Sequence, residues 1–267
     1  MPEGSGAYGG EIRGTLSGMH CITLDEMDSI KLMNRVDTKF LTDLETLGEI
    51  LRRAAPLYRV LETGGDRVAE YDTLYYDTDG YRMYLDHHQR RLNRRKVRTR
   101  TYLTSGDTYL EIKRKNNRGR TRKKRIPLPA DEFSSFSGNR TAAEFISSLT
   151  EFEAGALTPS TRTSFSRITL VNNARTERLT IDSGLEFENF RTGLKSGLSD
   201  AVIVELKQDG YCSSDIRKIL LDLRVKPVRV SKYCIGTVLT VPEIKKSRFI
   251  TKIRTIEKLI DTKLLDR

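Results

Sequence analysis

The chain has 267 residues, 37 % of them hydrophobic, and a formal net charge of +11. These values supply enough apolar side chains for a folded core and exclude a chain that is disordered throughout. No stretch approaches the ~20 apolar residues of a membrane span, and Cys21, Cys212 and Cys234 lack the spacing of a zinc site. We therefore expect a soluble protein of a reducing, cytoplasmic compartment.

The first part of the chain changes from an irregular stretch to a strand and a helix. Residues 1–21 are rich in Gly and Ser and lack periodicity, so we expect a flexible leader. Residues 34–40 alternate charged and apolar side chains, which predicts a strand. Thr42 and Glu45 then form the S/T-x-x-E pattern of a capping box, which predicts a helix that ends before Pro56.

The same signals predict most of the remaining elements. Further strands are expected at 57–61 and 68–77, joined as a hairpin across Gly64 and Gly65, and at 162–168, 178–182 and 201–207. Helices are expected at 79–88, at 131–153 with an interruption near Gly138, after Ser213 or Ser214, from Ser231 to Leu239, and at 245–265. The last helix is basic and amphipathic, and we leave open whether it packs on the protein's own surface or contacts a membrane face or a partner. These elements divide the chain into a leader at 1–21, one main domain at 22–242 and a C-terminal helix at 243–267.

Residues 90–125 concentrate the positive charge of the chain. They hold sixteen Lys or Arg and two acids, a net charge of +14, so the rest of the chain, at +11 overall, sums to −3. Residues 96–102 and 109–115 alternate with period two around the turn residues 105–107, which predicts a hairpin, and a third strand is expected at 122–127. A local concentration of this size indicates a polyanionic partner.

The alternation also predicts which basic side chains share a face. Arg98 and Arg100 are two residues apart and so lie on one face, as do Lys113 and Lys115, whereas Arg114 points the opposite way. About eight antiparallel strands of this kind predict an α+β fold with a closed antiparallel β-barrel, whose interior is a cationic tunnel, and with flanking helices. The following charged residues would line the tunnel: Arg35, Lys39, Arg98, Arg100, Lys113, Lys115, Arg162, Arg178 and Lys207, with Glu111 and Glu205 among them.

Such a tunnel needs an anionic occupant. Two like charges ~4 Å apart repel by ~4 kcal/mol at an effective dielectric constant near 20, and a linear phosphate chain would neutralise many such pairs. The chain has no P-loop, no GxGxxG pattern after a strand and no kinase signature, so phosphate must be bound by side chains. It has no RNA-recognition motif and no Trp, so we expect no sequence-specific nucleic acid. A non-catalytic polyanion- or RNA-binding module stays an alternative.

From Asn34 to Leu239 the chain resembles the VTC domain, the catalytic domain of polyphosphate polymerases, in the CYTH-like superfamily of triphosphate tunnel metalloenzymes. The resemblance lies in the order of nine motifs: RVDTKF at 35–40, YYDT at 75–78, RKVRTRTY at 95–102, EIKRK at 111–115, RKKRI at 122–126, RTSF at 162–165, RLTID at 178–182, VIVELK at 202–207 and SKY at 231–233. It implies a polymerase that transfers the γ-phosphoryl group of ATP to inorganic polyphosphate or pyrophosphate with Mn²⁺ or Mg²⁺.

The resemblance also implies roles for individual residues. Phosphate-binding, catalytic roles fall to Lys39, Arg98, Arg100, Lys113, Lys123, Arg162, Arg178 and Lys232, and a metal-binding role falls to Glu205. The tunnel pattern adds substrate-binding candidates at Arg35, Lys115, Lys124 and Lys207 and a second metal-binding candidate at Glu111; whether Lys123 or Lys124 points inward stays open. The alternative within the superfamily is a triphosphatase that hydrolyses tripolyphosphate or a nucleoside triphosphate. The two cations and one acid of RVDTKF, in place of the ExExK strand of triphosphatases, favour the polymerase.

Overall fold

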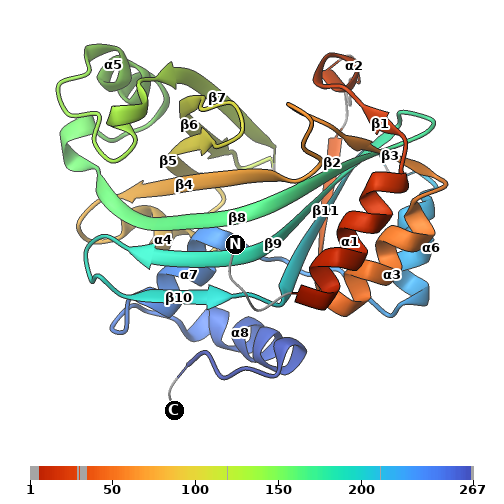
Figure 1. The fold of residues 1–267 in the computed structure, drawn as a ribbon. Coiled ribbons are helices and arrows are strands. Elements are labelled where there is room, and N and C mark those ends of the chain that lie inside the picture. Colours follow the sequence, from red (N-terminus) through yellow and green to blue (C-terminus); the bar gives the residue numbers. More distant parts are fainter. Residues whose placement is uncertain (1–5, 29, 31–34, 119, 211, 266–267) are drawn as a thin grey trace.

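The computed structural model describes residues 6–28, 30, 35–118, 120–210 and 212–265 (Figure 1). Its helices are α1 (Gly6–Gly18), α2 (Leu24–Asp28), α3 (Leu44–Ala54), α4 (Arg82–His88), α5 (Arg140–Leu149), α6 (Asp215–Asp222), α7 (Lys232–Thr240) and α8 (Ser247–Ile260), with short 3-10 turns at Ala130–Glu132 and Ala154–Ala156. Its strands are β1 (Cys21–Ile22), β2 (Arg35–Asp43), β3 (Tyr58–Leu61), β4 (Ala69–Asp77), β5 (Arg94–Tyr102), β6 (Thr108–Lys115), β7 (Thr121–Leu128), β8 (Thr158–Asn172), β9 (Glu177–Asn189), β10 (Lys195–Leu198) and β11 (Ala201–Asp209).

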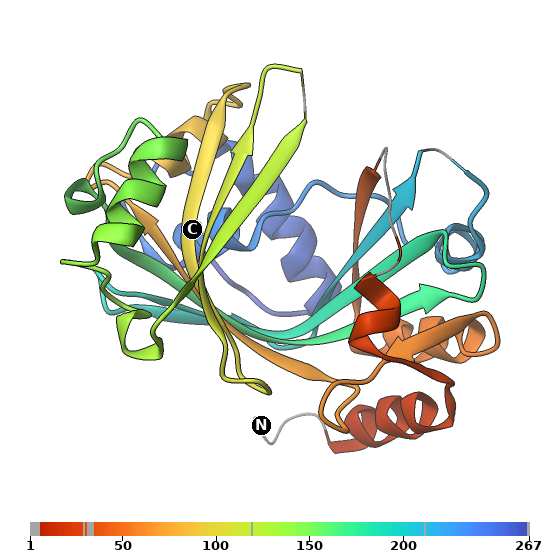
Figure 2. The same cartoon turned by 90° about the horizontal axis from the view of Figure 1, so that it is seen from above.

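Eight strands form one antiparallel sheet in the order β2-β11-β9-β8-β4-β5-β6-β7, and β1, β3 and β10 attach to it. The sheet curls into a half-barrel, with β5, β6 and β7 in one wall and β2 and β11 in the other (Figure 2). Among the strands that the structure describes, β2 and β7 end the order and do not pair with each other. The predicted closed barrel is therefore wrong. Alternation identifies strands, but closure requires backbone pairing between the first and last strand, which no local pattern encodes.

Helices cover the convex face of the sheet in two groups. Leu47, Ile50 and Leu51 of α3 are fully buried and pack with Ile181 and Val204 of the sheet, in a core that α1 and α6 complete. On the other half, α5 packs with the alternate residues of β4, β5 and β6 that point outward. Each helix thus buries the apolar register of strands whose opposite register faces the concave side.

The N-terminal segment differs from the predicted leader. Residues 1–5 lie outside the described part, but Gly6–Gly18 forms α1, and Leu16 and Met19 are buried in the same core as α3. The guanidinium of Arg67 donates hydrogen bonds to the backbone carbonyls of Leu16 and Met19 at the end of this helix. Long-range packing therefore orders a stretch whose Gly content argues for flexibility.

At one end of the half-barrel, α7 and α8 lie between the two walls (Figure 2). Ser231 caps α7, as predicted, by accepting a hydrogen bond from the backbone N–H of Cys234. The apolar face of α8, with Ile253 0 % and Ile256 1 % exposed, is buried in the core that α7 forms with the sheet. This helix therefore packs on the protein's own surface. Within the described ranges, no helix is long and apolar enough to cross a membrane.

Candidate functional site

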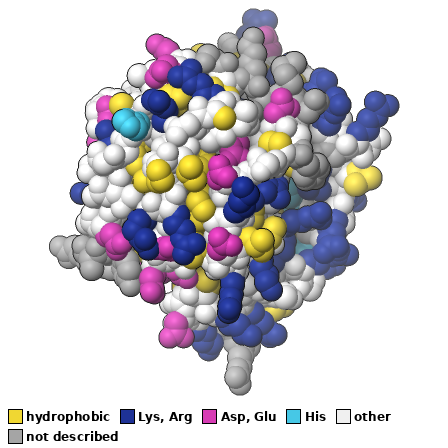
Figure 3. All heavy atoms as spheres, turned by 90° about the vertical axis from the view of Figure 1, so that its right-hand side faces the viewer, with side chains coloured by type: hydrophobic (Ala, Val, Ile, Leu, Met, Phe, Trp, Pro, Cys, Tyr) yellow, Lys and Arg dark blue, Asp and Glu magenta, His cyan; other side chains and the backbone are white. Residues whose placement is uncertain are grey.

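Charged side chains from seven strands and α7 converge on the concave face. The register places Lys39 opposite Glu205, Arg98 opposite Glu111 and Arg167 opposite Asp182 on neighbouring strands. We define the concave cluster as the cations Lys39, Lys96, Arg98, Arg100, Lys113, Lys123, Arg167, Lys207 and Lys232 and the carboxylates Glu111, Asp182 and Glu205. Nine cations against three carboxylates give the cluster a formal charge of +6. A space-filling view shows Lys and Arg gathered densely on one part of the surface (Figure 3).

Each of the three carboxylates holds two cations. Glu111, which is 0 % exposed, accepts hydrogen bonds from Arg98 at 2.5 and 2.9 Å and from Lys123 at 3.0 Å. Glu205 lies 2.7 Å from the Nζ of Lys39 and 3.3 Å from that of Lys207.

The third carboxylate, Asp182, accepts hydrogen bonds from Arg167 at 2.5 and 2.8 Å and pairs with Lys232. The ion pairs of these three carboxylates join residues of seven strands and the first turn of α7, so they fix the cations in place before any ligand binds.

Three further cations of the cluster lack such a partner. Within the described ranges, Lys96, Arg100 and Lys113 form no ion pair with a carboxylate. Arg100 is 7 % exposed and donates to the hydroxyl of Thr73 at 3.0 Å, and Lys96 donates to the hydroxyl of Ser231 at 2.9 Å. Burying positive charge without a counterion is costly, so these side chains create a strong local demand for an anion.

The pKa values of the cluster reflect this excess of positive charge. Burial alone would raise the pKa of Glu205, but the charges of Lys207 and Lys39 outweigh it and lower that pKa. Burial, only partly opposed by Glu205, lowers the pKa of Lys207 to about 8. The pKa of Lys113 lies well below its ordinary value, first because Arg98 is near and second because the side chain is buried. An anionic ligand would reverse these shifts of the lysines.

Aromatic rings form the floor below the cations. The rings of Tyr71 and Phe165 stack with centroids 5.2 Å apart, and the guanidinium of Arg100 lies 5.2 Å from the first and 5.7 Å from the second. Arg167 lies over both rings, and the Nζ of Lys232 lies over Phe165, 4.0 Å from its centroid. Cation–π contacts hold Arg100 without neutralising it, so its charge stays available to a ligand.

Most of the predicted site residues come together. The concave cluster contains Lys39, Arg98, Arg100, Lys113, Lys123, Lys207, Lys232, Glu111 and Glu205. Arg35, Lys115 and Arg178 lie on the same strand faces but nearer the strand ends, where Arg35 pairs with Asp37 at 2.8 Å and Arg178 donates to the backbone carbonyl of Met27 at 3.0 Å.

Two predicted residues point to the convex face instead. Arg162 lies opposite Leu74 of the outer core and pairs with Asp72 at 2.5 Å and with Glu188 at 3.6 Å. Lys124 lies opposite Ile112 of that core, whereas Lys123 lies opposite Lys113 and reaches Glu111. Both corrections have one cause: in a strand, a shift of one residue moves a side chain to the other face.

Lys96, Arg167 and Asp182 belong to the concave cluster but were not predicted as site residues. The position of Lys96 on the concave face could have been predicted, because Lys96 is two residues before Arg98 and so shares its face. Arg167 shares the face of Phe165, so it lies on the concave face where Arg162 was expected. Asp182 could have been found as the acid at the end of the strand that begins with Arg178.

Few side chains of the concave cluster could coordinate a metal ion. No three His, Cys, Asp or Glu side chains come together to hold a metal ion within the described residues. Both oxygens of Glu111 already accept from cations, whereas Glu205 is 18 % exposed and bound by flexible lysines only. Mg²⁺ in phosphate-transfer sites is commonly held by one or two carboxylates and the phosphates of the substrate. Glu205 fits that arrangement, and Glu111 does not.

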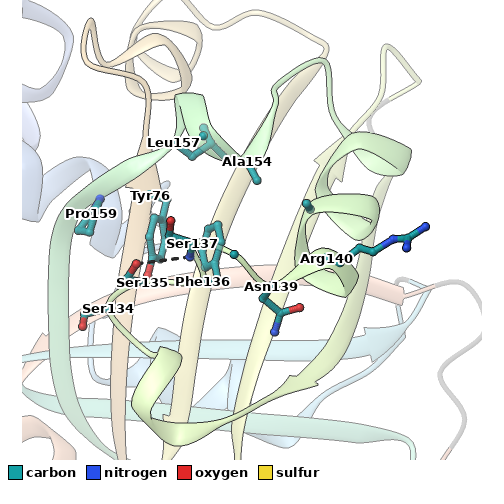
Figure 4. A pocket seen from close by; sticks show the side chains of 13 residues that line it. Tyr76, Ser134, Ser135, Phe136, Ser137, Asn139, Arg140, Ala154, Leu157 and Pro159 are labelled. Carbon is teal, nitrogen blue, oxygen red and sulfur yellow. Dashed lines mark hydrogen bonds between the residues drawn. The ribbon is translucent and has the colours of Figure 1, made fainter.

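A cavity of about 380 Å³ lies elsewhere, on the α5 side of the sheet (Figure 4). Serine residues of the segment before α5 and the rings of Tyr76 and Phe136 line it. Its one charged lining residue, Arg140, points away from the cavity and pairs with Glu144 at 2.8 Å. This cavity lacks the charge to hold a phosphate chain.

Comparison with known proteins adds a family and several distant structures. The family model of the VTC domain matches residues 34–241. Similar solved structures include a candidate adenylate cyclase from Bacillus halodurans (13% identity, 74% of this chain and 96% of that chain, TM-score 0.48). They also include a candidate adenylyl cyclase from Hippeastrum with a dominant triphosphatase activity (12% identity, 76% of this chain and 94% of that chain, TM-score 0.49). No curated protein matches the chain significantly.

Proposed function

Because the chain belongs to the VTC domain family, we propose that it is a polyphosphate polymerase, which transfers the γ-phosphoryl group of ATP to the end of an inorganic polyphosphate chain. One observation carries the proposal: the concave cluster holds nine cations against three carboxylates, and Lys96, Arg100 and Lys113 have no carboxylate partner among the residues that the structure describes. A linear polyanion would supply the missing negative charges along the face.

The transfer needs no nucleophile from the protein. A terminal oxygen of the acceptor phosphate attacks the γ-phosphorus, a new P–O–P bond forms, the bond to the β-phosphate oxygen breaks, and ADP leaves. The attacking oxygen is already ionised, so no general base has to remove a proton. The protein's task is to align the two phosphate groups and to neutralise the charge that spreads over the transferred group.

The cluster suits that task. Arg98, Lys123 and Arg167 are held by buried carboxylates and stacked rings, so they need little reorganisation when a phosphate chain binds. Arg100 and Lys113 lie between them with their charge unpaired. Fixed cations of this kind stabilise the transition state by electrostatics, because their positions are set before the reaction begins.

A divalent cation, Mn²⁺ or Mg²⁺, is part of the proposal. Glu205 would hold it together with phosphate oxygens of the substrate. When bound, the ion would supply further neutralisation of the phosphates.

The proposal is tested by incubating the purified protein with ATP, a pyrophosphate primer and Mn²⁺ or Mg²⁺. We expect a polymer that an exopolyphosphatase degrades, and ADP in the amount of phosphate incorporated. Glu205→Gln should make no polymer yet still bind polyphosphate, because the change removes a negative charge from the face.

Release of inorganic phosphate from ATP or tripolyphosphate with no polymer would assign a triphosphatase instead. Tight polyanion binding with neither product would assign a binding module. Full activity of Glu205→Gln at saturating metal would contradict the role given to that carboxylate.

A further inference from the structure

A row of four aromatic rings crosses the concave face from one strand to the next. Phe165 of β8, Tyr71 of β4, Tyr102 of β5 and Tyr109 of β6 form it, and these strands follow each other in this order in the sheet. The centroids of successive rings lie 5.2, 5.1 and 5.8 Å apart. The first two rings are the floor below the cations, whereas Tyr102 and Tyr109 belong to the wall that β5, β6 and β7 form (Figure 2). These two tyrosines have no part in the transfer proposed above.

The two tyrosines of the wall do not complete an apolar core. Both are half-buried, whereas Tyr76 and Tyr233 are only 2 % and 1 % exposed. Among the described residues, neither Tyr102 nor Tyr109 belongs to any of the four apolar cores of the protein. Packing with apolar side chains therefore does not explain why two large rings stand on a face that otherwise carries charge.

One further side chain, Arg125 of β7, connects the two rings. Its guanidinium carbon lies 4.3 Å from the centroid of Tyr109, and its Nη1 donates to the hydroxyl of Tyr102 at 3.3 Å. Lys123, two residues earlier on the same strand face, pairs with Glu111, but Arg125 is exposed and forms no ion pair among the described residues. Proteins stack unpaired nucleobases on aromatic rings and on guanidinium planes of this kind.

We call Tyr102, Tyr109 and Arg125 the aromatic platform, and this platform adjoins the concave cluster. Tyr102 follows Arg100 by two residues on β5, and Arg125 follows Lys123 by two residues on β7. Two residues of a strand span about 7 Å, so the platform lies directly beside the cations. A nucleoside triphosphate joins a flat base to a row of phosphates, and this face places a stacking surface beside a row of cations. Tripolyphosphate has the same charged part without the base.

We propose that the aromatic platform is a nucleobase-binding site, on which the base of the donor nucleotide stacks against Tyr109 and Arg125 while its triphosphate lies on the concave cluster. That the triphosphate belongs to a nucleotide rests on the proposed function, whereas the platform rests on the placement of its three side chains. Every base has a π-face, so stacking binds bases of different kinds. The site should therefore add affinity for a nucleotide with little preference for one base.

The test compares ATP with tripolyphosphate by calorimetric titration of the purified protein, without metal and at constant pH and salt. Tyr109→Leu removes a ring and keeps the charge of the face. ATP should therefore bind about tenfold more weakly, as expected for the loss of one stacked base. The affinity for tripolyphosphate should not change, which also shows that the variant folds. Phe190→Leu is the matched control, because Phe190 is a 44 % exposed ring in the turn between β9 and β10, and it should alter neither affinity.

A second variant uses the fact that the chain contains no tryptophan. Tyr109→Trp keeps an aromatic ring on the platform and makes it the only source of tryptophan fluorescence. Its affinity for ATP should match that of the parent protein. Saturating ATP, GTP or CTP should each change its emission, because a base then stacks on the ring, whereas saturating tripolyphosphate should change it little.

Equal weakening of both ligands by Tyr109→Leu would overturn the proposal, as would unchanged affinity for both. An emission of Tyr109→Trp that responds to tripolyphosphate as strongly as to ATP would also overturn it. None of these measurements needs turnover. A protein that makes no polymer but loses only ATP affinity in Tyr109→Leu would contradict the polymerase and leave the base site in place, and a polymerase whose Tyr109→Leu variant keeps its ATP affinity would do the reverse.

Discussion

At the scale of single residues, the concave cluster contains two kinds of cation. Arg98 and Lys123 share Glu111, so removing either one leaves a buried carboxylate with a missing partner and destabilises the fold. Arg100 and Lys113 form no ion pair with a carboxylate of the described residues, so removing either one leaves no described carboxylate unpaired. Variants of this second kind can therefore separate an effect on ligand binding from an effect on folding.

Lys113→Met is the sharpest such change, because Met keeps much of the shape of Lys and removes its charge. In the ligand-free protein the charge of Lys113 is repelled by Arg98 and Arg100, so the melting temperature should rise. Tripolyphosphate binding should weaken by tenfold or more, as expected for the loss of a hydrogen bond to a charged group of about 1.5–3 kcal/mol. Thermal unfolding and titration calorimetry give the two values.

Arg114→Met is the matched control, because Arg114 is the next residue of β6, carries the same charge and is exposed on the other face. It should change tripolyphosphate affinity little. Equal weakening of tripolyphosphate binding by both variants, by an amount that depends on the salt concentration, would be the contrary result. It would mean that the ligand is bound by summed surface charge and not by the concave face.

At the scale of elements, α7 sets the end of the concave face, and Gly236 sets how closely it packs on the sheet. A Cβ at this position would lie 2.5 Å from Cδ1 of Phe187 and 2.9 Å from Cγ2 of Thr161. Gly236→Ala should therefore destabilise the protein by about 1–3 kcal/mol, although Ala normally favours a helix over Gly by about 1 kcal/mol. Denaturant unfolding measures the sign directly.

The control is Gly14→Ala in α1, where no described heavy atom outside the adjacent residues and the local helix backbone comes within 4 Å of the added Cβ. It should stabilise the protein by about 0.5–1 kcal/mol. A stabilising Gly236→Ala would mean that α7 sits farther from β8 and β9, and with it Lys232 at the start of that helix.

The elements also show what the sequence could reveal. Side-chain alternation placed Arg98, Arg100 and Lys113 on the concave face, because a period of two is a local property of a strand. It failed for Arg162, since β8 presents Arg162 on one face and Arg167 on the other, and the pattern does not say which face is concave. The predicted capping box at Thr42 was one residue early, because β2 extends to Asp43, which accepts from the N–H of Thr46 at 2.7 Å.

The pairing of strands that are distant in the sequence was predicted less well than the direction of side chains. Gly64 and Gly65 do adopt positive φ angles in a turn, yet β3 and β4 do not form the predicted hairpin, since both pair with β8 instead. A turn signal reports the local backbone, whereas strand order depends on contacts between distant segments. The open edge between β2 and β7 escaped prediction for the same reason.

At the scale of the whole molecule, the half-barrel holds nine mutually repelling cations on one face. Three carboxylates, each paired with two of these cations, offset part of that repulsion. Net charge is only −3 outside residues 90–125, so most of the excess positive charge lies in and beside β5, β6 and β7, which form one wall of the half-barrel. A bound polyanion should stabilise the entire sheet, because its charge acts on both walls at once.

Burial of positive charge on the concave face predicts how stability depends on pH. Burial lowers the pKa of Lys207 to about 8, and in the unfolded chain a lysine titrates near 10.4. Between these values the unfolded chain binds more protons than the folded one, so the contribution of Lys207 to the free energy of unfolding rises with pH. Tripolyphosphate needs the charged ammonium, so its affinity should fall over the same range.

Comparison with Lys207→Met isolates the contribution, because other groups titrate in parallel and the raised pKa of the Cys234 thiol acts in the opposite direction. From pH 7.5 to 9.5 the parent protein should gain about 1–2 kcal/mol of unfolding free energy relative to the variant. Its tripolyphosphate affinity should fall more steeply than the variant's. Parallel unfolding curves for the two proteins across this range would contradict a buried ammonium at Lys207 and, with it, the cost of buried positive charge from which the ligand demand of the concave face is inferred.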